Sequence, residues 1–113
     1  MIGKFLVIGM VIAIAAPLVA HAETWQNVPA VDNQCYTKVK ESPDQHTVSC
    51  ALACAKSGYG IIAADGSFLK FDESGNARVI ELLKGTRQKD HIRVTVDGER
   101  NGETIKVTSV SLN

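Results

Sequence analysis

The stretch IRVTVDGERNGETIKVTSV, residues 92–110, carries the clearest structural pattern in the chain. Apolar and polar residues alternate on both sides of Asn101-Gly102, with apolar side chains at Ile92, Val94, Val96, Ile105, Val107 and Val110. A period of two places successive side chains on opposite faces of a strand. Asn-Gly between two such runs is a strong signal for a hairpin with a type I′ turn. The stretch therefore predicts two antiparallel strands, each with one buried face.

Further short elements precede this hairpin. A second hairpin is indicated by Ala64-Asp65-Gly66 between two mainly apolar runs, residues 59–63 and 67–71. A short helix is expected over residues 77–84, with Gly85 as its end. A first short strand is expected over residues 28–31, and residues 38–45 are expected to form a polar loop interrupted by Pro43.

Another helix is predicted over residues 48–57. Ala51, Leu52 and their neighbours favour helix, and Gly58 suits the left-handed position that follows a helix end. Either Thr47 or Ser49 can serve as its N-cap, because a hydroxyl oxygen accepts a hydrogen bond from a free N–H of the first turn.

The order of these elements indicates the fold class. Five short strands cannot bury both faces of a flat sheet, and they curl more readily into a small barrel. The helix over residues 77–84 lies between the third and fourth strands, as it does in OB-like barrels. We therefore predict a mainly β protein with a small, OB-like, partly open five-stranded barrel. A short cysteine-bearing helix follows the first strand, and a second short helix follows the third.

The N-terminal residues have the pattern of an export signal. Lys4 precedes an apolar run from Phe5 to Ala16, and Ala20-His21-Ala22 fits the small-residue rule for cleavage. The run is shorter than the roughly 20 residues of a membrane span, which favours cleavage over anchoring. We predict a signal peptide over residues 1–22, a single OB-like domain over residues 23–113, and a periplasmic or secreted location without a stable membrane span.

Charge and sequence motifs limit the classes of function that this chain can have. The 12 Lys and Arg residues balance 12 Asp and Glu residues, and they form no basic stripe. Nucleic acid is therefore excluded as a partner, because phosphate binding depends on clustered positive charge. No phosphate-binding loop and no Ser/His/Asp set stands out. The chain thus favours a binding or structural module over an enzyme, with a metal ion or a protein as the expected partner.

Three cysteines and a histidine form a candidate metal site. Cys35, His46, Cys50 and Cys54 offer three sulfurs and one nitrogen, a set that suits Zn²⁺ or Cu(I). Residues four apart on a helix lie on one face about 6 Å apart, whereas residues eight apart are separated by about 12 Å. His46 must therefore reach the ion from the loop before the helix, and Cys35 must complete the site from the end of the first strand.

Two other interpretations of the cysteines remain open. A disulfide from Cys35 to Cys50 or Cys54 would close a loop of about 15 to 20 residues, worth about 3 kcal/mol, and would leave one free thiol in a structural or interaction domain. Alternatively, with Ser49 as N-cap, Cys50 would open the helix as a reactive thiol in a redox protein. The C-x3-C spacing differs from the C-x-x-C of thioredoxin-like enzymes.

The chain also resembles a known family. The residues concerned are Asp32-Asn33-Gln34-Cys35, His46, Cys50, Cys54, Ala55-Lys56-Ser57-Gly58, the hairpin at Asp65-Gly66 and the final hairpin over residues 94–110. This pattern resembles that of small exported bacterial OB-like domains of unknown function, over about residues 28–111. The resemblance implies export and the OB-like fold, and it implies no activity.

Overall fold

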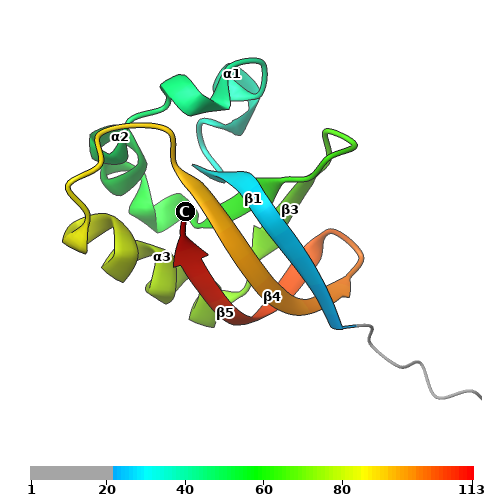
Figure 1. Cartoon of the computed structure of the whole chain (residues 1–113). Helices are drawn as coiled ribbons and strands as arrows, with labels where there is room; N and C mark the ends of the chain where they lie inside the picture. Colours follow the sequence, from blue (N-terminus) through cyan, green and yellow to red (C-terminus); the bar gives the residue numbers. More distant parts are fainter. Residues whose placement is uncertain (1–21) are drawn as a thin grey trace, which may run out of the picture.

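The computed structural model describes residues 22–113, which form five strands and several short helices (Figure 1). The predicted export signal lies outside these residues except for Ala22, which begins the first strand. The strands are β1 (Ala22–Asp32), β2 (Tyr59–Ile62), β3 (Phe68–Phe71), β4 (Arg93–Asn101) and β5 (Thr104–Leu112). They form a barrel in the order β1-β2-β3-β5-β4, which confirms the predicted mainly β, OB-like architecture. None of the described helices combines the length and apolar composition that a membrane crossing requires.

The barrel is closed, whereas the sequence predicted a partly open one. Closure depends on a parallel pairing of β3 with β5 through two residue pairs, Lys70 with Thr104 and Phe71 with Ile105. All other neighbouring strands are antiparallel. A parallel pair requires a crossover connection, and this connection includes the helix α3 (Glu73–Gly85). The contact between β3 and β5 is therefore set by packing between segments far apart in sequence.

The final hairpin forms as predicted, but its turn lies one residue later. Asn101 pairs with Thr104 at the end of the ladder, so the two-residue loop is Gly102-Glu103. Gly102 has φ +62°, and among the described residues positive φ outside glycine is confined to Asn27 and His91. A glycine at the first central position is typical of a type II′ turn, which replaces the predicted type I′ turn.

The first strand is longer than the predicted residues 28–31. β1 pairs with β4 through its first two thirds and with β2 through its last three residues. The register shifts between Trp25 and Val28, and Asn27 within this bulge has φ +50°. A bulge breaks the simple alternation on which sequence patterns depend, and this explains why the first half of the strand was missed.

The helix α3 begins four residues before the predicted residues 77–84. Asp72 caps it, because one carboxylate oxygen accepts hydrogen bonds from Gly75 N at 3.0 Å and from Val107 N at 3.2 Å. Ser74, Gly75 and Asn76 therefore belong to the first turn of the helix. A Cβ at Gly75 would lie 2.5 Å from the Val107 side chain, so only glycine lets α3 approach β5 this closely.

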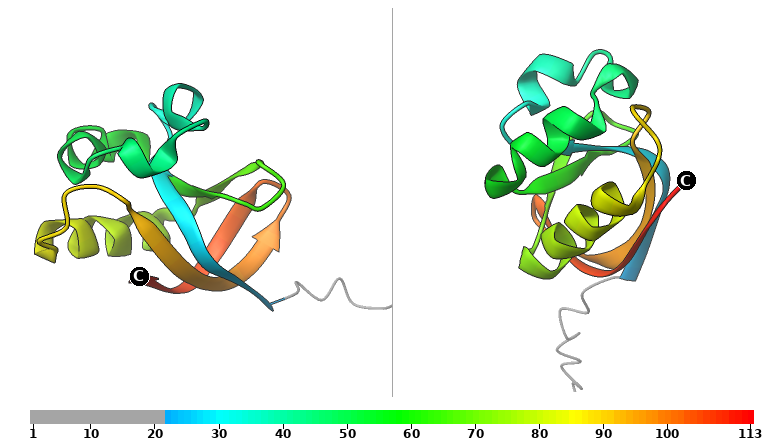
Figure 2. Two further views of the ribbon diagram at one scale, coloured as in Figure 1. Left: turned by 45° about the horizontal axis from the view of Figure 1, so that its top comes forward. Right: turned by 90° about the vertical axis from the view of Figure 1, so that its left-hand side faces the viewer.

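The chain between β1 and β2, residues 33–58, is here called the helical insertion. It contains α1 (Tyr36–Val39), a 3₁₀ turn (Pro43–Gln45), α2 (Val48–Ala53) and a second 3₁₀ turn (Ala55–Ser57). The helical insertion lies over one end of the barrel, and α2 lies beside α3 (Figure 2). The polar loop predicted over residues 38–45 thus includes the end of α1 and one 3₁₀ turn.

The helix predicted over residues 48–57 is divided at Cys54. The α-helix ends at Ala53, and a tighter 3₁₀ turn continues to Ser57 before Gly58, which has φ +80°. Ser57 Oγ donates a hydrogen bond to the Cys54 carbonyl at 2.8 Å. Such tightening is common in the last turn of a helix, where carbonyl groups lack partners from the helix itself.

Specific side chains fasten the helical insertion to the barrel. Arg93 on β4 forms two hydrogen bonds with the Asp44 carboxylate, at 2.9 and 3.0 Å. Tyr36 stacks on Phe68 with ring centroids 4.5 Å apart, and its hydroxyl donates to the Gly66 carbonyl at 3.1 Å. These contacts hold α1 and the first 3₁₀ turn against the strands.

Candidate functional site

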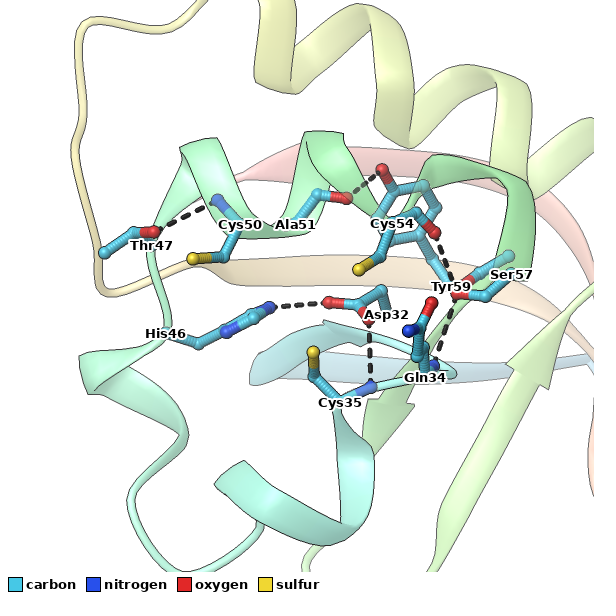
Figure 3. A network of polar contacts seen from close by, with 11 residues as sticks. Asp32, Gln34, Cys35, His46, Thr47, Cys50, Ala51, Cys54, Ser57 and Tyr59 are labelled. Atoms are coloured by element: carbon cyan, nitrogen blue, oxygen red, sulfur yellow. Dashed lines mark hydrogen bonds and ion pairs between the residues drawn. The ribbon is translucent and has the colours of Figure 1, made fainter.

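The predicted site residues come from three parts of the chain and meet where β1 enters the helical insertion (Figure 3). Cys35 is the N-cap of α1, three residues after the end of β1. His46 follows the first 3₁₀ turn. Cys50 lies within α2 and Cys54 at its C-terminal end. The fold therefore gathers residues that the sequence only suggested could meet.

A buried carboxylate lies at the centre of the site. Asp32 is fully buried at the end of β1, and His46 is 6% exposed. Asp32 Oδ1 accepts a hydrogen bond from His46 Nε2 at 2.6 Å, and Oδ2 accepts one from the Cys35 backbone N–H at 3.0 Å. Burying a carboxylate is costly unless its oxygens are satisfied, so both contacts stabilise Asp32 in this position.

Asp32, Cys35 and His46 form a group that could hold a metal ion. Each residue offers one ligand atom, and these atoms lie within 4.8 Å of one another. The group combines a carboxylate oxygen, a thiol sulfur and an imidazole nitrogen, all of which are ligand types for Zn²⁺. The sequence placed Asp32 in a motif without giving it a function. Its position three residues before Cys35 was the available signal.

The Asp32–His46 contact has the geometry of a hydrogen bond. Two ligand atoms bound to one tetrahedral zinc lie about 3.3 Å apart, given bonds of about 2.0 to 2.1 Å. The observed separation of 2.6 Å is that of a charge-assisted hydrogen bond. Asp32 thus fixes the orientation of the imidazole through Nε2, an arrangement typical of histidines that bind metals through their other nitrogen.

The Cys35 thiol is held in its neutral form. Burial, a hydrogen bond with Asp32 and the charge of Asp32, together with interactions with Cys54, raise the pKa of Cys35 from 9.0 to about 11. A reactive thiol requires a lowered pKa, so Cys35 lacks the character of a redox nucleophile. A metal ion bound here would have to displace the thiol proton.

Cys54 lies beside Cys35, and Cys50 lies one helical turn away from Cys54. The contribution of Cys54 to the raised pKa of Cys35 reflects their proximity. The Cys54 backbone N–H bonds to the Cys50 carbonyl at 3.2 Å, which keeps both residues on one face of α2. Their sulfur atoms lie on the side of α2 that faces His46 and Cys35 (Figure 3). Both Cys50 and Cys54 lie outside the group of Asp32, Cys35 and His46, and of the two only Cys50 is exposed.

The helix cap bears on the redox interpretation. Thr47 is the N-cap of α2, and its Oγ1 accepts a hydrogen bond from Cys50 N at 3.1 Å. Thr47 was one of the two predicted caps. Cys50 is consequently the third helical residue, whereas the redox interpretation took it as the first with Ser49 as the cap.

A pocket opens beside the site. It has a volume of about 270 Å³, and its lining includes Lys38 from α1, His46 from the preceding loop and Cys50 from α2. The buried imidazole and the exposed thiol thus share one opening to solvent. On the opposite side of the site, the Tyr59 hydroxyl donates to the Ala51 carbonyl at 2.7 Å.

The pKa of Tyr59 is affected by the charges of the site. Burial, followed by the charges of Asp32 and Cys54, raises the pKa of Tyr59 from 10.0 to about 12. This side chain is 1% exposed and belongs to the barrel core. The site is therefore anchored directly on the core through Tyr59 and α2.

All three cysteines are free thiols in this structure. The predicted metal set of Cys35, His46, Cys50 and Cys54 stays a prediction, as does a disulfide from Cys35 to Cys50 or Cys54. No protein-family model matches the chain, and no curated protein and no solved structure matches it.

Proposed function

We propose that the protein is an exported binding module for a soft or borderline metal ion, Zn²⁺ or Cu(I), rather than an enzyme. The supporting observation is the group of Asp32, Cys35 and His46, whose ligand atoms lie within 4.8 Å of one another. In this proposal Cys35 and His46 Nδ1 bind the ion, and Asp32 acts through its hydrogen bond to His46. Cys54 is the third inner ligand, because its side chain interacts with the Cys35 thiol. Cys50, the fourth predicted ligand, is exposed, and in this proposal it is not one of the inner ligands.

The donor set favours a thiophilic ion. Two thiolates and one imidazole suit Zn²⁺ or Cu(I), whereas Mg²⁺ and Ca²⁺ prefer oxygen ligands. Asp32 is not a ligand in this proposal. Its hydrogen bond to His46 Nε2 at 2.6 Å orients the ring, so that Nδ1 binds the ion. The site has three inner ligands from the chain, which leaves a zinc ion one tetrahedral position for a further ligand.

Binding should depend on pH because the Cys35 thiol must lose its proton. The pKa of Cys35 is raised to about 11, so the thiol is protonated at neutral pH without metal. Metal competes with this proton, and the apparent affinity should fall by about tenfold for each pH unit below that pKa from this thiol alone. Titration with metal at several pH values measures this slope.

A comparison of two histidines tests the proposal. His91 also contacts a carboxylate, Asp90 at 2.8 Å, but both side chains are largely exposed and lie outside the cysteine site. Affinity for Zn²⁺ and Cu(I) is measured by competition with a chromogenic chelator. His46→Gln and Cys35→Ser should each weaken binding by about 10- to 100-fold, and His91→Gln should leave it unchanged. Glutamine retains an N–H donor for Asp32, which limits damage to the fold.

Equal binding by the wild-type protein, His46→Gln and Cys35→Ser would contradict the proposed site. Native mass spectrometry supplies the stoichiometry, with one ion per chain expected. Circular dichroism of each variant shows whether the variant has lost binding only because it is unfolded.

A disulfide-stapled structural or interaction domain is the second candidate. The observation that favours it is the proximity of Cys54 to the Cys35 thiol. Such a bridge would tie α2 to the end of β1 and occupy two sulfurs of the metal site. Intact mass under non-reducing conditions distinguishes the two candidates: a mass two hydrogens short with one alkylatable thiol supports the bridge, and three alkylatable thiols with a bound ion support the metal site.

A further inference from the structure

Cys50 differs from the other two cysteines in its surroundings. It is exposed, while Cys35 and Cys54 are half-buried. It lines the pocket together with His46, whereas neither Cys35 nor Cys54 lines it. The hydrogen bond from its backbone N–H to Thr47 Oγ1 at 3.1 Å fixes its place in the helix. An exposed thiol that shares a pocket with a buried imidazole is placed to meet an incoming ion first.

The imidazole of His46 reaches the same pocket. The hydrogen bond recorded for the ring uses Nε2. Within residues 22–113, no buried side-chain nitrogen or oxygen lacks a hydrogen-bond partner. Nδ1, which has no recorded partner, is therefore accessible rather than buried, although the residue is only 6% exposed. His46 lines the pocket, and the second nitrogen lies on the part of the ring further from Asp32 (Figure 3).

The charge at the pocket indicates what kind of donor can approach. Of the described residues that line it, Lys38 carries a formal charge and none is a carboxylate. A free cation would be repelled weakly by this lysine. Cu(I) held by two thiolates, or Zn²⁺ held by three or more, is an anionic complex, and a lysine in the pocket lining attracts it. The pocket of about 270 Å³ has room for a small thiol ligand.

We propose that Cys50 is the exchange ligand of this site, and that it accepts the metal from a small anionic metal–thiolate complex at the pocket. This inference rests on the proposed metal-binding function. The Cys50 thiol gives up its proton, its sulfur bonds to the metal, and one metal–sulfur bond to the incoming complex breaks. The departing thiolate takes up a proton. No electrons are transferred, and the metal keeps its oxidation state.

A second ligand exchange completes the transfer. Cys54 lies one helical turn from Cys50 on the same face, about 6 Å along the helix axis. The Cys54 thiol gives up its proton, and its sulfur displaces the remaining external thiolate, which takes up a proton. Cys35 then gives up its proton and, together with His46, replaces Cys50, whose sulfur is reprotonated as it leaves the metal. The exposed thiol is thereby free for the next exchange, and the same steps in reverse release the ion.

The test separates the rate of transfer from the strength of binding. Cu(I) bound by excess reduced glutathione serves as the anionic donor, and stopped-flow spectroscopy follows transfer to the protein. Cys50→Ser should slow transfer by about tenfold or more, while the equilibrium affinity changes by less than about threefold. Ser49→Ala is the matched control, because this neighbouring exposed residue does not line the pocket.

Lys38→Gln tests the charge of the donor. This variant should slow transfer from the anionic glutathione complex by several-fold, and added salt should reduce the difference. Transfer from the cationic Cu(I)–acetonitrile complex should not slow, since the lysine offers that donor no attraction.

Two results would overturn the exchange role. Unchanged transfer rates in Cys50→Ser would show that the ion reaches the inner site without this thiol. A loss of affinity of tenfold or more without slower transfer would show that Cys50 is an equilibrium ligand instead. A wild-type protein that binds neither Cu(I) nor Zn²⁺ would contradict the proposed metal-binding function itself, and this result is distinct from the two above.

Discussion

The barrel and the helical insertion are stabilised in different ways. The barrel has hydrogen-bonded ladders between all its neighbouring strands and a core in which Ile61, Leu69 and Ile105 are fully buried. The helical insertion, residues 33–58, contributes few buried side chains, those of His46, Val48 and Ala51. It depends instead on individual contacts such as the pair Asp44–Arg93. Burial of apolar area stabilises the scaffold, and directional polar contacts position the chemistry.

This difference indicates which part of the molecule can open locally without unfolding the rest. Opening of the helical insertion disrupts a small number of contacts, whereas opening of the barrel exposes the whole core. The two regions should therefore differ in their free energy of opening, as is common for functional segments on rigid scaffolds. The predictions below test that difference, from the largest expected effect to the smallest.

The largest loss should come from the barrel core. Leu69 is fully buried on β3, and Leu69→Ala should lower the free energy of unfolding by about 2 to 5 kcal/mol through lost burial and a residual cavity. Leu52→Ala in α2 is the matched control, because Leu52 is only partly buried against the core. Urea unfolding measures both. An equal loss in the two variants would mean that the regions do not differ as described.

A smaller, local effect should follow from Tyr59→Phe. The change removes the hydroxyl that donates to the Ala51 carbonyl, which should lower stability by about 1 kcal/mol. Amide hydrogen exchange should accelerate in α2 and stay unchanged in the β4–β5 ladder. Tyr36→Phe, which removes a longer and more exposed hydrogen bond to Gly66, should have a weaker effect. Uniform acceleration across the barrel would contradict a local role.

Tyr59 should also make the free energy of unfolding depend on pH in the alkaline range. The pKa of Tyr59 is raised from 10.0 to about 12, so the protonated phenol contributes stability that is complete below the lower value and lost as pH rises through the upper one. Tyr59→Phe should remove that decline. The variant's unfolding free energy should therefore fall less steeply than the wild type's over this range.

The smallest effect should come from the ion pair between the regions. The Arg93 guanidinium lowers the pKa of Asp44, so the pair stabilises the fold above the ordinary pKa of aspartate, and this contribution is lost as pH falls through the lowered value. Both side chains are 34% exposed, and solvent screening should keep the coupling below about 1 kcal/mol. A double-mutant cycle with Asp44→Asn and Arg93→Gln measures it at neutral and acid pH. A coupling that grows as pH falls would contradict this assignment.

Much of the fold could be predicted because its signals are local. The last two strands follow from alternation in residues 92–110, and Thr47 was among the predicted caps of the cysteine-bearing helix. The start of α3 escaped prediction because Asp72 bonds both to its own helix at Gly75 and to Val107 on β5. The second contact links residues distant in sequence, and no local pattern reports it.

The candidate site was only partly predictable for the same reason. Residue types and spacing led to the prediction that Cys35, His46, Cys50 and Cys54 bind one metal ion, and of these four the structure places Cys35 and His46 in one candidate group with Asp32. They did not show that Asp32 bonds to His46, which lies fourteen residues further along the chain. Nor did they show that Cys50 is exposed while Cys35 and Cys54 are half-buried.

By itself, the sequence determined the strand-rich composition, the final hairpin and the set of sulfur and nitrogen donors, because each depends on residue type and short-range periodicity. Tertiary structure alone decided the parallel closure of β3 on β5, the burial of Asp32 and the opening beside His46 and Cys50. These features depend on which distant segments pack together. Packing sets burial, and burial determines which donor is held in place, which thiol keeps its proton and which one meets the solvent.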